Sequence, residues 1–309
     1  MSAPAVVALG EPMVEFNQTR PGEHNYLQGF GGDTSNAIIA CARQGASTAY
    51  LTRLGDDDFG RQLLQLWADE GVSTNGVGID ADAHTAVYFV SHGPDGHRFD
   101  YLRRGSAASR MTPDWLPRDL ITGARFLHVS AVSQAISQNA AETVAAAIQA
   151  ARSAGVTVCY DTNLRLKLWS LERAREVIGA TIGDTDYLLP SIDDLAALCA
   201  RDSPDAILDW CFAQGARHVV LKLGAAGCIA ATADARVAIP GHAVAAVDAT
   251  GAGDCFDGAF IARLLAGDSL VSAARYANAA AALTTTGYGA VAPLPRPDAV
   301  LRLLESSTS

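Results

Sequence analysis

Short apolar segments rich in β-branched residues alternate with longer segments of helical periodicity along almost the whole chain. The short segments predict strands at Ala5–Leu9, Thr48–Leu54, Arg125–Ser130, Val156–Asp161, Tyr187–Pro190, His218–Leu223, Cys228–Thr232 and Arg236–Ile239. The longer segments predict helices at Asp33–Gln44, Asp58–Glu70, Asn139–Ala154, Leu171–Ile182, Ile192–Ala200, Pro204–Gln214, Gly251–Leu265, Leu270–Thr286 and Arg296–Leu304. Because parallel strands need crossover helices, this order predicts an α/β fold with a mostly parallel central sheet and helices on both faces.

One region interrupts this alternation. Thr85–Ser91 and His97–Arg103 are two alternating segments joined by Gly93–Gly96, whose Pro-Asp-Gly sequence is typical of a hairpin turn. A further strand-like segment, Asn25–Phe30, lies between the first strand and the first long helix. We therefore expect a single domain over residues 1–309 with a small antiparallel β lid, built discontinuously from about residues 12–31 and 74–105.

Composition and charge narrow the class of protein. The chain has 309 residues, of which 49% are hydrophobic and 18% charged, so it can bury a large core and is not disordered. Its formal net charge of −10 speaks against nucleic acid or an anionic membrane as a partner. The six cysteines form no Cys-x-x-Cys pair, and the N-terminal segment lacks the basic region of a signal peptide. These features predict a cytoplasmic protein with unpaired thiols.

The strongest chemical signal is the sequence Asp-Ala-Thr-Gly-Ala-Gly-Asp at residues 248–254, directly before a predicted apolar helix. Small residues at a helix N-terminus leave the backbone N–H groups of Gly251, Ala252 and Gly253 accessible to an anion. Asp254 then lies in the first helical turn, where its carboxylate can accept a proton from an attacking hydroxyl. A helix-capping turn would explain one glycine and one aspartate, but not Gly-Ala-Gly between two acids.

This motif also carries a family resemblance. The sequence DATGAGDCFDGAF, residues 248–260, resembles the C-terminal signature of the ribokinase-like (PfkB) carbohydrate kinases, in which the Asp after Gly-Ala-Gly is the catalytic base. Residues 31–36, GGDTSN, resemble the family's N-terminal Gly-Gly…Asn motif, and residues 55–60, GDDDFG, its GxDxxG element. The resemblance covers nearly the whole chain and implies a sugar kinase that uses ATP and Mg²⁺, and in many members K⁺. It also implies that the lid covers the sugar site.

Within this family, the segments expected at the sugar site, residues 9–16 and 101–108, most resemble those of 2-keto-3-deoxygluconate kinases. Residues 161–169, DTNLRLKLW, match an element shared with fructokinases. An arginine fork binds carboxylates in bidentate fashion, so we expect Arg103 and Arg165 to hold the carboxylate of a sugar acid. Arg104 is the alternative to Arg103 if the register differs, and an ordinary surface position is the alternative for each arginine.

The rest of the sugar site is predicted at two places. Gly32, Asp33 and Asn36 open the first long helix, where glycine permits close approach and the polar side chains can bond hydroxyls. Tyr88 and Tyr101 lie on the predicted lid hairpin and combine an apolar ring with a hydroxyl. For both tyrosines, packing within the lid sheet is an equal alternative.

The nucleotide end follows from the resemblance alone. It implies that Lys222, Gly224 and Gly227, in the predicted strand–turn–strand at residues 219–227, contact ATP, although a plain hairpin explains this segment equally well. By the same resemblance, Asn278 is expected near the adenine and residues 287–290 form the loop behind it.

The segment Pro-Ser-Ile-Asp-Asp at residues 190–194 departs from the family pattern Asn-x-x-Glu, which is associated with Mg²⁺. Ser191 stands in place of Asn and Asp194 in place of Glu, and both still offer the oxygen atoms that Mg²⁺ and its waters prefer. Ser191 is accordingly expected beside the nucleotide and Asp194 near the metal. A helix N-cap role for Ser191 is the competing interpretation.

Together these observations predict an ATP-dependent kinase for the terminal 6-hydroxyl of 2-keto-3-deoxygluconate, with 2-keto-3-deoxy-6-phosphogluconate as the product. The alternative is a fructokinase or another ketose or sugar-acid kinase of the same family. A silent binding protein is disfavoured by Asp254 in its expected context, and a nicotinamide oxidoreductase by the missing GxGxxG. The exposed edges of a lid sheet, together with the resemblance, predict a homodimer formed through the lid.

Overall fold

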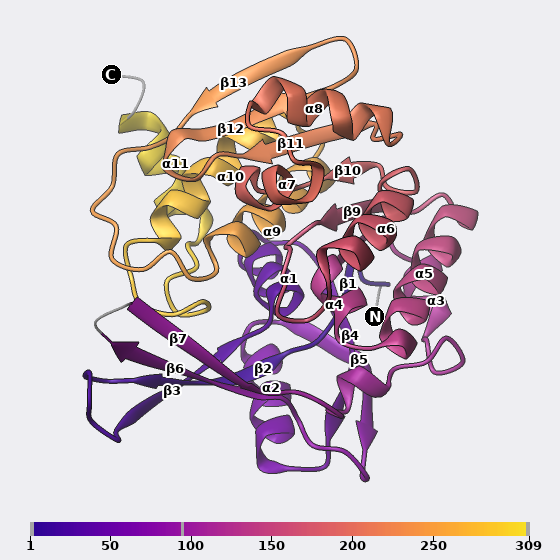
Figure 1. Ribbon diagram of the computed structural model, residues 1–309, viewed down its shortest axis with the longest axis vertical. Coiled ribbons are helices and arrows are strands. Elements are labelled where there is room, and N and C mark those ends of the chain that lie inside the picture. The colour runs from indigo at the N-terminus through magenta and orange to yellow at the C-terminus, as the bar shows by residue number, and fades with distance from the viewer. Residues whose placement is uncertain (1–2, 94–95, 307–309) are drawn as a thin grey trace.

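The computed structural model describes residues 3–93 and 96–306. Within these residues, nine strands form one large sheet (Figure 1). Its spatial order is β13 (Arg236–Pro240), β12 (Gly227–Ala231), β11 (His218–Lys222), β10 (Tyr187–Leu188), β9 (Thr157–Asp161), β8 (Phe126–Ser130), β1 (Val6–Leu9), β4 (Thr48–Gly55) and β5 (Val72–Asp80). Neighbours are parallel from β5 to β11, and only β12 and β13 add on in antiparallel fashion. The predicted mostly parallel sheet is confirmed.

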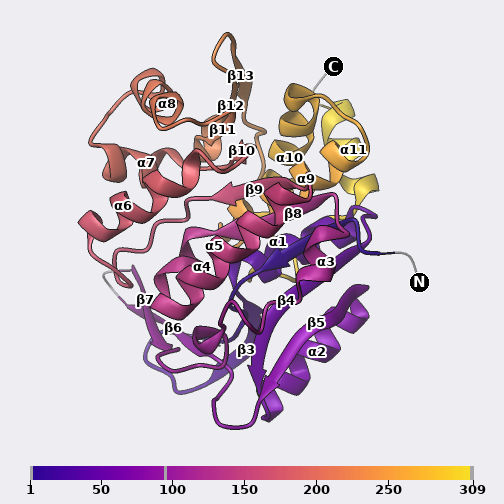
Figure 2. The same ribbon diagram turned by 90° about the vertical axis from the view of Figure 1, so that its right-hand side faces the viewer.

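Helices cover both faces of this sheet. One face carries α1 (Asp33–Arg43), α2 (Asp58–Asp69), α9 (Ala252–Leu265), α10 (Leu270–Thr284) and α11 (Pro297–Ser306). The other carries α3 (Arg118–Thr122), α4 (Ala131–Ala135), α5 (Gln138–Ser153), α6 (Leu171–Ile182), α7 (Ile192–Cys199) and α8 (Pro204–Ala213), of which α4, α5 and α6 lie in front of the sheet in Figure 2. Strand β1 shows why two cores form: Val6 faces one cluster and Val7 the other, as side chains alternate along a strand.

The lid is a separate four-stranded sheet at the lower left of Figure 1, in the order β3 (Tyr26–Gly31), β2 (Met13–Gln18), β6 (Val87–Gly93) and β7 (Gly96–Leu102). Both hairpins are antiparallel, which confirms the predicted pairing of the second, and a parallel pairing of β2 with β6 joins them. Gly93 pairs with Gly96, whereas the predicted turn residues Pro94 and Asp95 lie outside the described residues.

The second lid segment does not begin at about residue 74 as expected. Residues 72–80 instead form β5, the edge strand of the large sheet, paired with β4. The sequence pattern does not predict this strand, because the segment is rich in glycine and polar residues. Gly76 has a packing reason, since a Cβ there would lie 2.1 Å from a methyl carbon of Leu51 on the neighbouring strand.

The motif at residues 55–60 ties the lid to the body. The Asp57 side chain caps α2 by accepting the N–H of Gly60 at 2.7 Å, and its other oxygen accepts the N–H of Thr85 at 2.7 Å. The N–H of Gly55 donates to the Thr85 hydroxyl at 3.0 Å. Thr85 lies two residues before β6, so this cluster fixes the point at which the chain enters the second hairpin.

The predicted unpaired state of the cysteines is confirmed: each of the six is a free thiol, and all but the half-buried Cys199 are buried. Burial raises the pKa of the Cys41 thiol to about 12, so this group stays protonated at neutral pH. Across residues 3–93 and 96–306, none of the helices combines the length and the apolar composition that a membrane span needs.

Helices α1 and α9 pack with their backbones in contact at Gly258. A Cβ at this position would lie 2.1 Å from the carbonyl oxygen of Ala37 and 2.8 Å from the Cβ of Ala40. Glycine is therefore required for the two helices to come this close. The contact places the N-terminal turns of both helices side by side, and those turns carry the polar residues singled out by their motifs.

We expect Gly258→Ala to lower the free energy of unfolding by about 1–3 kcal/mol, because the added methyl group must push the helices apart. Gly179→Ala is the matched control: Gly179 is also helical, but its added Cβ would meet nothing closer than the Gln214 Oε1 at 3.6 Å. There the helix propensity of alanine should raise stability by up to about 1 kcal/mol. Urea unfolding measures both variants, and equal changes in the two would contradict the packing argument.

Candidate active site

The loop before α9 has a backbone conformation that depends on glycine. Gly251 has a φ of +75° and forms the N-cap of α9. A Cβ there would also lie 2.8 Å from the carbonyl oxygen of Ala290. The Asp248 carboxylate holds the loop by accepting the N–H of Thr250 at 2.9 Å and the N–H of Gly289 at 2.9 Å. The loop thus brings the helix N-terminus, a favourable place for an anion, to a fixed position.

Asp254 lies in the first turn of α9 and is half-buried. Its Oδ2 accepts a hydrogen bond of 2.8 Å from the Nδ2 of Asn36 in α1, a residue 218 positions away in the chain. Burial, together with the negative charge of Asp33, raises the pKa of Asp254 to about 7. A carboxylate with this pKa suits proton transfer near neutral pH.

Asp33 connects the same site to the end of β9. One of its oxygens accepts the N–H of Thr34 at 2.8 Å and the other accepts the Nδ2 of Asn163 at 3.0 Å. Asn163 has a φ of +25°, and its N–H donates to Asp161 at 3.0 Å. Gly32 precedes this group with a φ of +108°, where a Cβ would lie 2.5 Å from the carbonyl oxygen of Glu11. The structure therefore brings together Gly32, Asp33, Asn36 and Asp254 as the sequence predicts.

Lys222, predicted to contact ATP, forms two ion pairs inside the protein. Its Nζ lies 3.2 Å from a carboxylate oxygen of Asp161 and 2.9 Å from one of Asp257, and only 12% of its side chain is exposed. The two negative charges raise the pKa of Lys222 against the effect of burial. The ammonium expected at the ATP is thus held by two internal carboxylates, because the site would otherwise bury them without a counter-ion.

The other residues predicted at the nucleotide also have internal explanations. Gly227 has a φ of +103°, and a Cβ there would lie 2.0 Å from the carbonyl oxygen of Ile239, as the β11–β12–β13 meander requires. The buried Asn278 donates from Nδ2 to the carbonyl of Pro240 at 2.8 Å. Gly224, in contrast, is exposed with open space around it, at the end of β11.

Ser191 forms the N-cap of α7, where its hydroxyl accepts the N–H of Asp194 at 3.1 Å. This is the competing interpretation given above for Ser191. Burial and the charge of Asp161 raise the pKa of Asp194. Within the described residues, no group of three or more His, Cys, Asp or Glu side chains is arranged to hold a metal ion.

On the lid, both predicted tyrosines belong to one aromatic stack. The Tyr88 hydroxyl donates to the Glu15 carboxylate, and its ring stacks on that of Tyr101 at 5.7 Å between centroids. Tyr88 is buried, whereas Tyr101 keeps 37% of its surface exposed. Packing within the lid sheet accounts for Tyr88, whereas the side chain of Tyr101 remains accessible at the protein surface.

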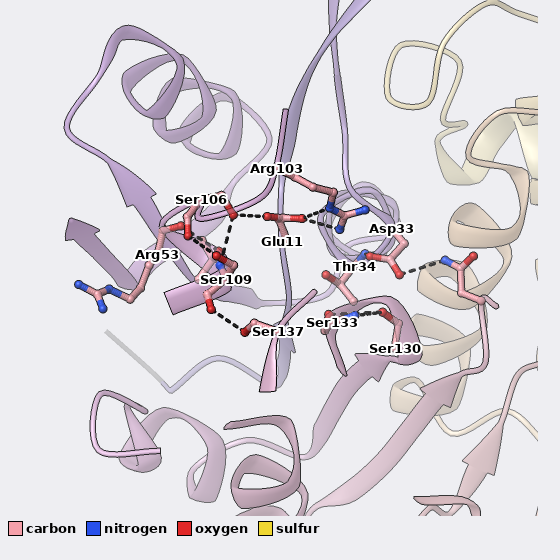
Figure 3. Close-up of polar contacts among 12 residues, drawn as sticks. Glu11, Asp33, Thr34, Arg53, Arg103, Ser106, Ser109, Ser130, Ser133 and Ser137 are labelled. Atoms are coloured by element: carbon pink, nitrogen blue, oxygen red, sulfur yellow. Dashed lines mark hydrogen bonds and ion pairs between the residues drawn. The ribbon is translucent and has the colours of Figure 1, made fainter. Parts of the chain in front are cut away.

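Arg103, expected to hold the carboxylate of a sugar acid, is paired inside the protein. Its guanidinium pairs with the fully buried Glu11, to which Nε donates at 2.7 Å (Figure 3). The other Glu11 oxygen accepts the hydroxyl of Ser106. Arg165 is exposed and donates from Nη1 to the carbonyl of Leu164 at 2.9 Å, and Arg104, the alternative, is also exposed. The charge of Arg103 is therefore already paired with an internal carboxylate, through one oxygen of Glu11.

Four residues of this site escaped the sequence analysis: Glu11, Asp161, Asn163 and Asp257. Asp257 left a signal, because it is a carboxylate in the middle of the apolar helix CFDGAFIARLL. Asp161 and Asn163 stood in the matched element DTNLRLKLW without an assigned role. Glu11 had no local signal, because its partner Arg103 lies 92 positions away.

Comparison with known proteins agrees with this arrangement. The family pattern of the pfkB family carbohydrate kinases matches residues 3–297. Fructokinase-1 of Zea mays and fructokinase-1 of Oryza sativa subsp. japonica are each 35% identical, over 98% of this chain and 98% of theirs. A crystal structure of fructokinase from Vibrio cholerae O395, in a form with fructose, ADP and calcium ion bound, is 29% identical with a TM-score of 0.89, covering 98% of this chain and 100% of that one.

The matched pattern spans almost the whole chain and includes both the Gly-Gly…Asn motif in front of α1 and the Gly-Ala-Gly-Asp motif in front of α9. These are the two segments whose side chains meet at the hydrogen bond between Asn36 and Asp254. The relatives named above are fructokinases. The chain belongs to the pfkB family of carbohydrate kinases.

Proposed function

We propose that this kinase transfers the γ-phosphoryl group of ATP to the terminal hydroxyl of a neutral ketose, with fructose as the favoured substrate. The observation that carries the choice of a neutral sugar is the ion pair between Arg103 and the buried Glu11. Because this pair neutralises the arginine on the lid, Arg103 offers no uncompensated positive charge to a substrate carboxylate.

The charges around the sugar end support the same choice. Asp33, Asp254 and Glu15 surround it with carboxyl groups, and the charge of Asp33 already raises the pKa of Asp254. A sugar acid would add a further negative charge, whereas the hydroxyls of a neutral ketose can donate hydrogen bonds to these carboxylates. The fructokinase relatives agree with this proposal.

In the proposed mechanism, ionised Asp254 takes the proton of the attacking sugar hydroxyl. The oxygen then bonds to the γ-phosphorus, the bond from phosphorus to the bridging oxygen breaks, and ADP leaves. Asn36 orients the carboxylate through its 2.8 Å hydrogen bond. Of the backbone N–H groups at residues 251–253, that of Ala252 already donates to the carbonyl of Ala249 at 3.2 Å, so those of Gly251 and Gly253 would stabilise charge on the transferring group. The lid excludes water.

Mg²⁺ fits this site as an ion carried mainly by the nucleotide, since no cluster of three ligating side chains is present in the described part of the chain. Asp194, whose pKa is raised by burial and by the charge of Asp161, is the carboxyl group of the nucleotide side that would bind its waters. Bound Mg²⁺ would supply positive charge to the phosphate oxygens.

Replacing Asp254 by Asn should lower kcat by about 10²–10⁴-fold, because the amide cannot accept the proton. The KM for ATP should change little. Asp58→Asn is the matched control, since Asp58 also lies in a first helical turn but is exposed, with 85% of its side chain accessible. Steady-state kinetics with fructose and ATP measures both, and wild-type turnover in Asp254→Asn would remove Asp254 from the mechanism.

The raised pKa of Asp254 predicts a pH dependence with a defined sign. Below its pKa of about 7 the carboxyl is protonated and cannot act as a base, so kcat/KM for fructose should fall about tenfold per pH unit. Above it, kcat/KM should level off. A profile between about pH 5.5 and 8.5 at saturating ATP measures the midpoint, and constant activity down to pH 5.5 would refute the proposed protonation state.

The substrate proposal is tested by ATP consumption on a panel of fructose, ribose, 2-keto-3-deoxygluconate, its galactonate epimer and no sugar. We expect the largest kcat/KM for fructose, because Glu11 already occupies Arg103. Turnover confined to the two sugar acids would overturn the neutral-ketose proposal while leaving the kinase chemistry intact. Such a result would also indicate that Arg165, with or without Arg103, binds the substrate carboxylate.

A further inference from the structure

Three charged side chains form a cluster beside the N-terminal turn of α9 at residues 251–253. Lys222 of β11 lies between Asp161 of β9 and Asp257 of α9, at 3.2 Å and 2.9 Å. Exposure of the three side chains is 12%, 6% and 1%, respectively. Burying a charge is costly unless it has a partner of opposite charge. The two buried carboxylates therefore depend on the ammonium group of Lys222.

The position of this cluster relates it to the reacting groups. A Cβ on Gly253 would lie 3.7 Å from the Nζ of Lys222, so the ammonium lies against the loop that precedes the base. Asp257 follows Asp254 by about one turn of α9. Asp161 holds the N–H of Asn163, whose amide in turn binds Asp33. The cluster therefore contacts the supports of both the anion loop and the sugar end.

Two carboxylates and one ammonium group act electrostatically on Asp254. Asp33 and Asp161 raise its pKa by their charges, and Lys222 opposes them by its own. The buried Asp257 has a raised pKa because of its burial, while that of Asp161 is lowered by the nearby ammonium despite burial. The titratable groups on the surrounding elements include Asp33 of α1, Tyr88 of β6, His128 of β8, Asp161 of β9, Lys222 of β11, and Cys255 and Asp257 of α9.

None of the neutral members of this set replaces Lys222. Burial lowers the pKa of His128 to about 4, so the imidazole carries no charge at neutral pH. Burial raises the pKa of Cys255 to about 12 and also that of Tyr88, so both stay protonated. The ammonium is accordingly the fixed cation that balances the carboxylates around the base.

We propose that Lys222 is a positioning residue of the phosphoryl-transfer site, clamped by Asp161 and Asp257 so that its charge keeps Asp254 available as the base, and that it does not bind the nucleotide. This inference rests on the proposed kinase function with Asp254 as base. It differs from the role that the family resemblance implied, a direct contact with ATP. The two roles predict different kinetic consequences for the same substitutions.

Lys222→Met removes the charge but keeps an unbranched side chain. We expect the acid limb of kcat/KM for fructose to move upward by about one pH unit, equivalent to about tenfold lower activity on that limb. The KM for ATP should change less than about threefold. Lys222→Arg, which keeps the charge, should restore the midpoint, and Asp257→Asn, which keeps the shape of the cluster, should not move it upward.

An unchanged midpoint together with a KM for ATP raised about tenfold or more would overturn the proposal and identify Lys222 as a nucleotide ligand. Should Lys222→Met not fold, Lys222→Gln gives the same test, because its amide can still hydrogen-bond the carboxylates. The Asp254→Asn variant distinguishes failure of the Lys222 inference from failure of the proposed function. If Asp254→Asn is inactive while the Lys222→Met midpoint stays at the wild-type value, only this inference fails, whereas an active Asp254→Asn refutes the proposed function.

Discussion

Helices α1 and α9 come from opposite ends of the chain and pack with backbone contact at Gly258, which sets the distance between their first turns. Asn36 on one helix and Asp254 on the other then meet at 2.8 Å. A larger separation would leave Asp254 without its hydrogen-bond donor and would admit water between the helices. The sugar end in front of α1 and the anion loop in front of α9 are thus parts of one site because of this helix pair.

Electrostatic balance is the second constraint on the site. Carboxylates from α1, β9 and α9 lie close together there. Two cations of this region form internal ion pairs, Arg103 with Glu11 and Lys222 with Asp161 and Asp257. Both cations were expected at substrates, but both are bound internally. This pattern supports the proposed neutral sugar, whose hydroxyls would use the remaining carboxylates. In the same proposal the nucleotide is held by the helix N-terminus and its own metal ion.

Much of the fold followed from the sequence because buried strands and amphipathic helices have distinct periodicities, and α6 was predicted with its observed bounds. The polar, glycine-rich β5 was missed because its pattern is not that of a buried strand. In the site, local motifs predicted Asp33, Asn36 and Asp254 correctly as neighbours. The partners of Arg103 and Lys222 were not predictable locally, since Glu11 and Asp161 lie 92 and 61 positions away from them.

The most direct measurement is the titration of the aspartate carboxyl groups by NMR in protein labelled with ¹³C-aspartate. The account predicts one carboxyl with a midpoint of about 7 that is absent in Asp254→Asn. It also predicts that this midpoint moves upward in Lys222→Met. A wild-type spectrum in which the Asp254 carboxyl titrates near the ordinary aspartate pKa of about 3.9 would contradict the account, because burial among carboxylates would then not control the base.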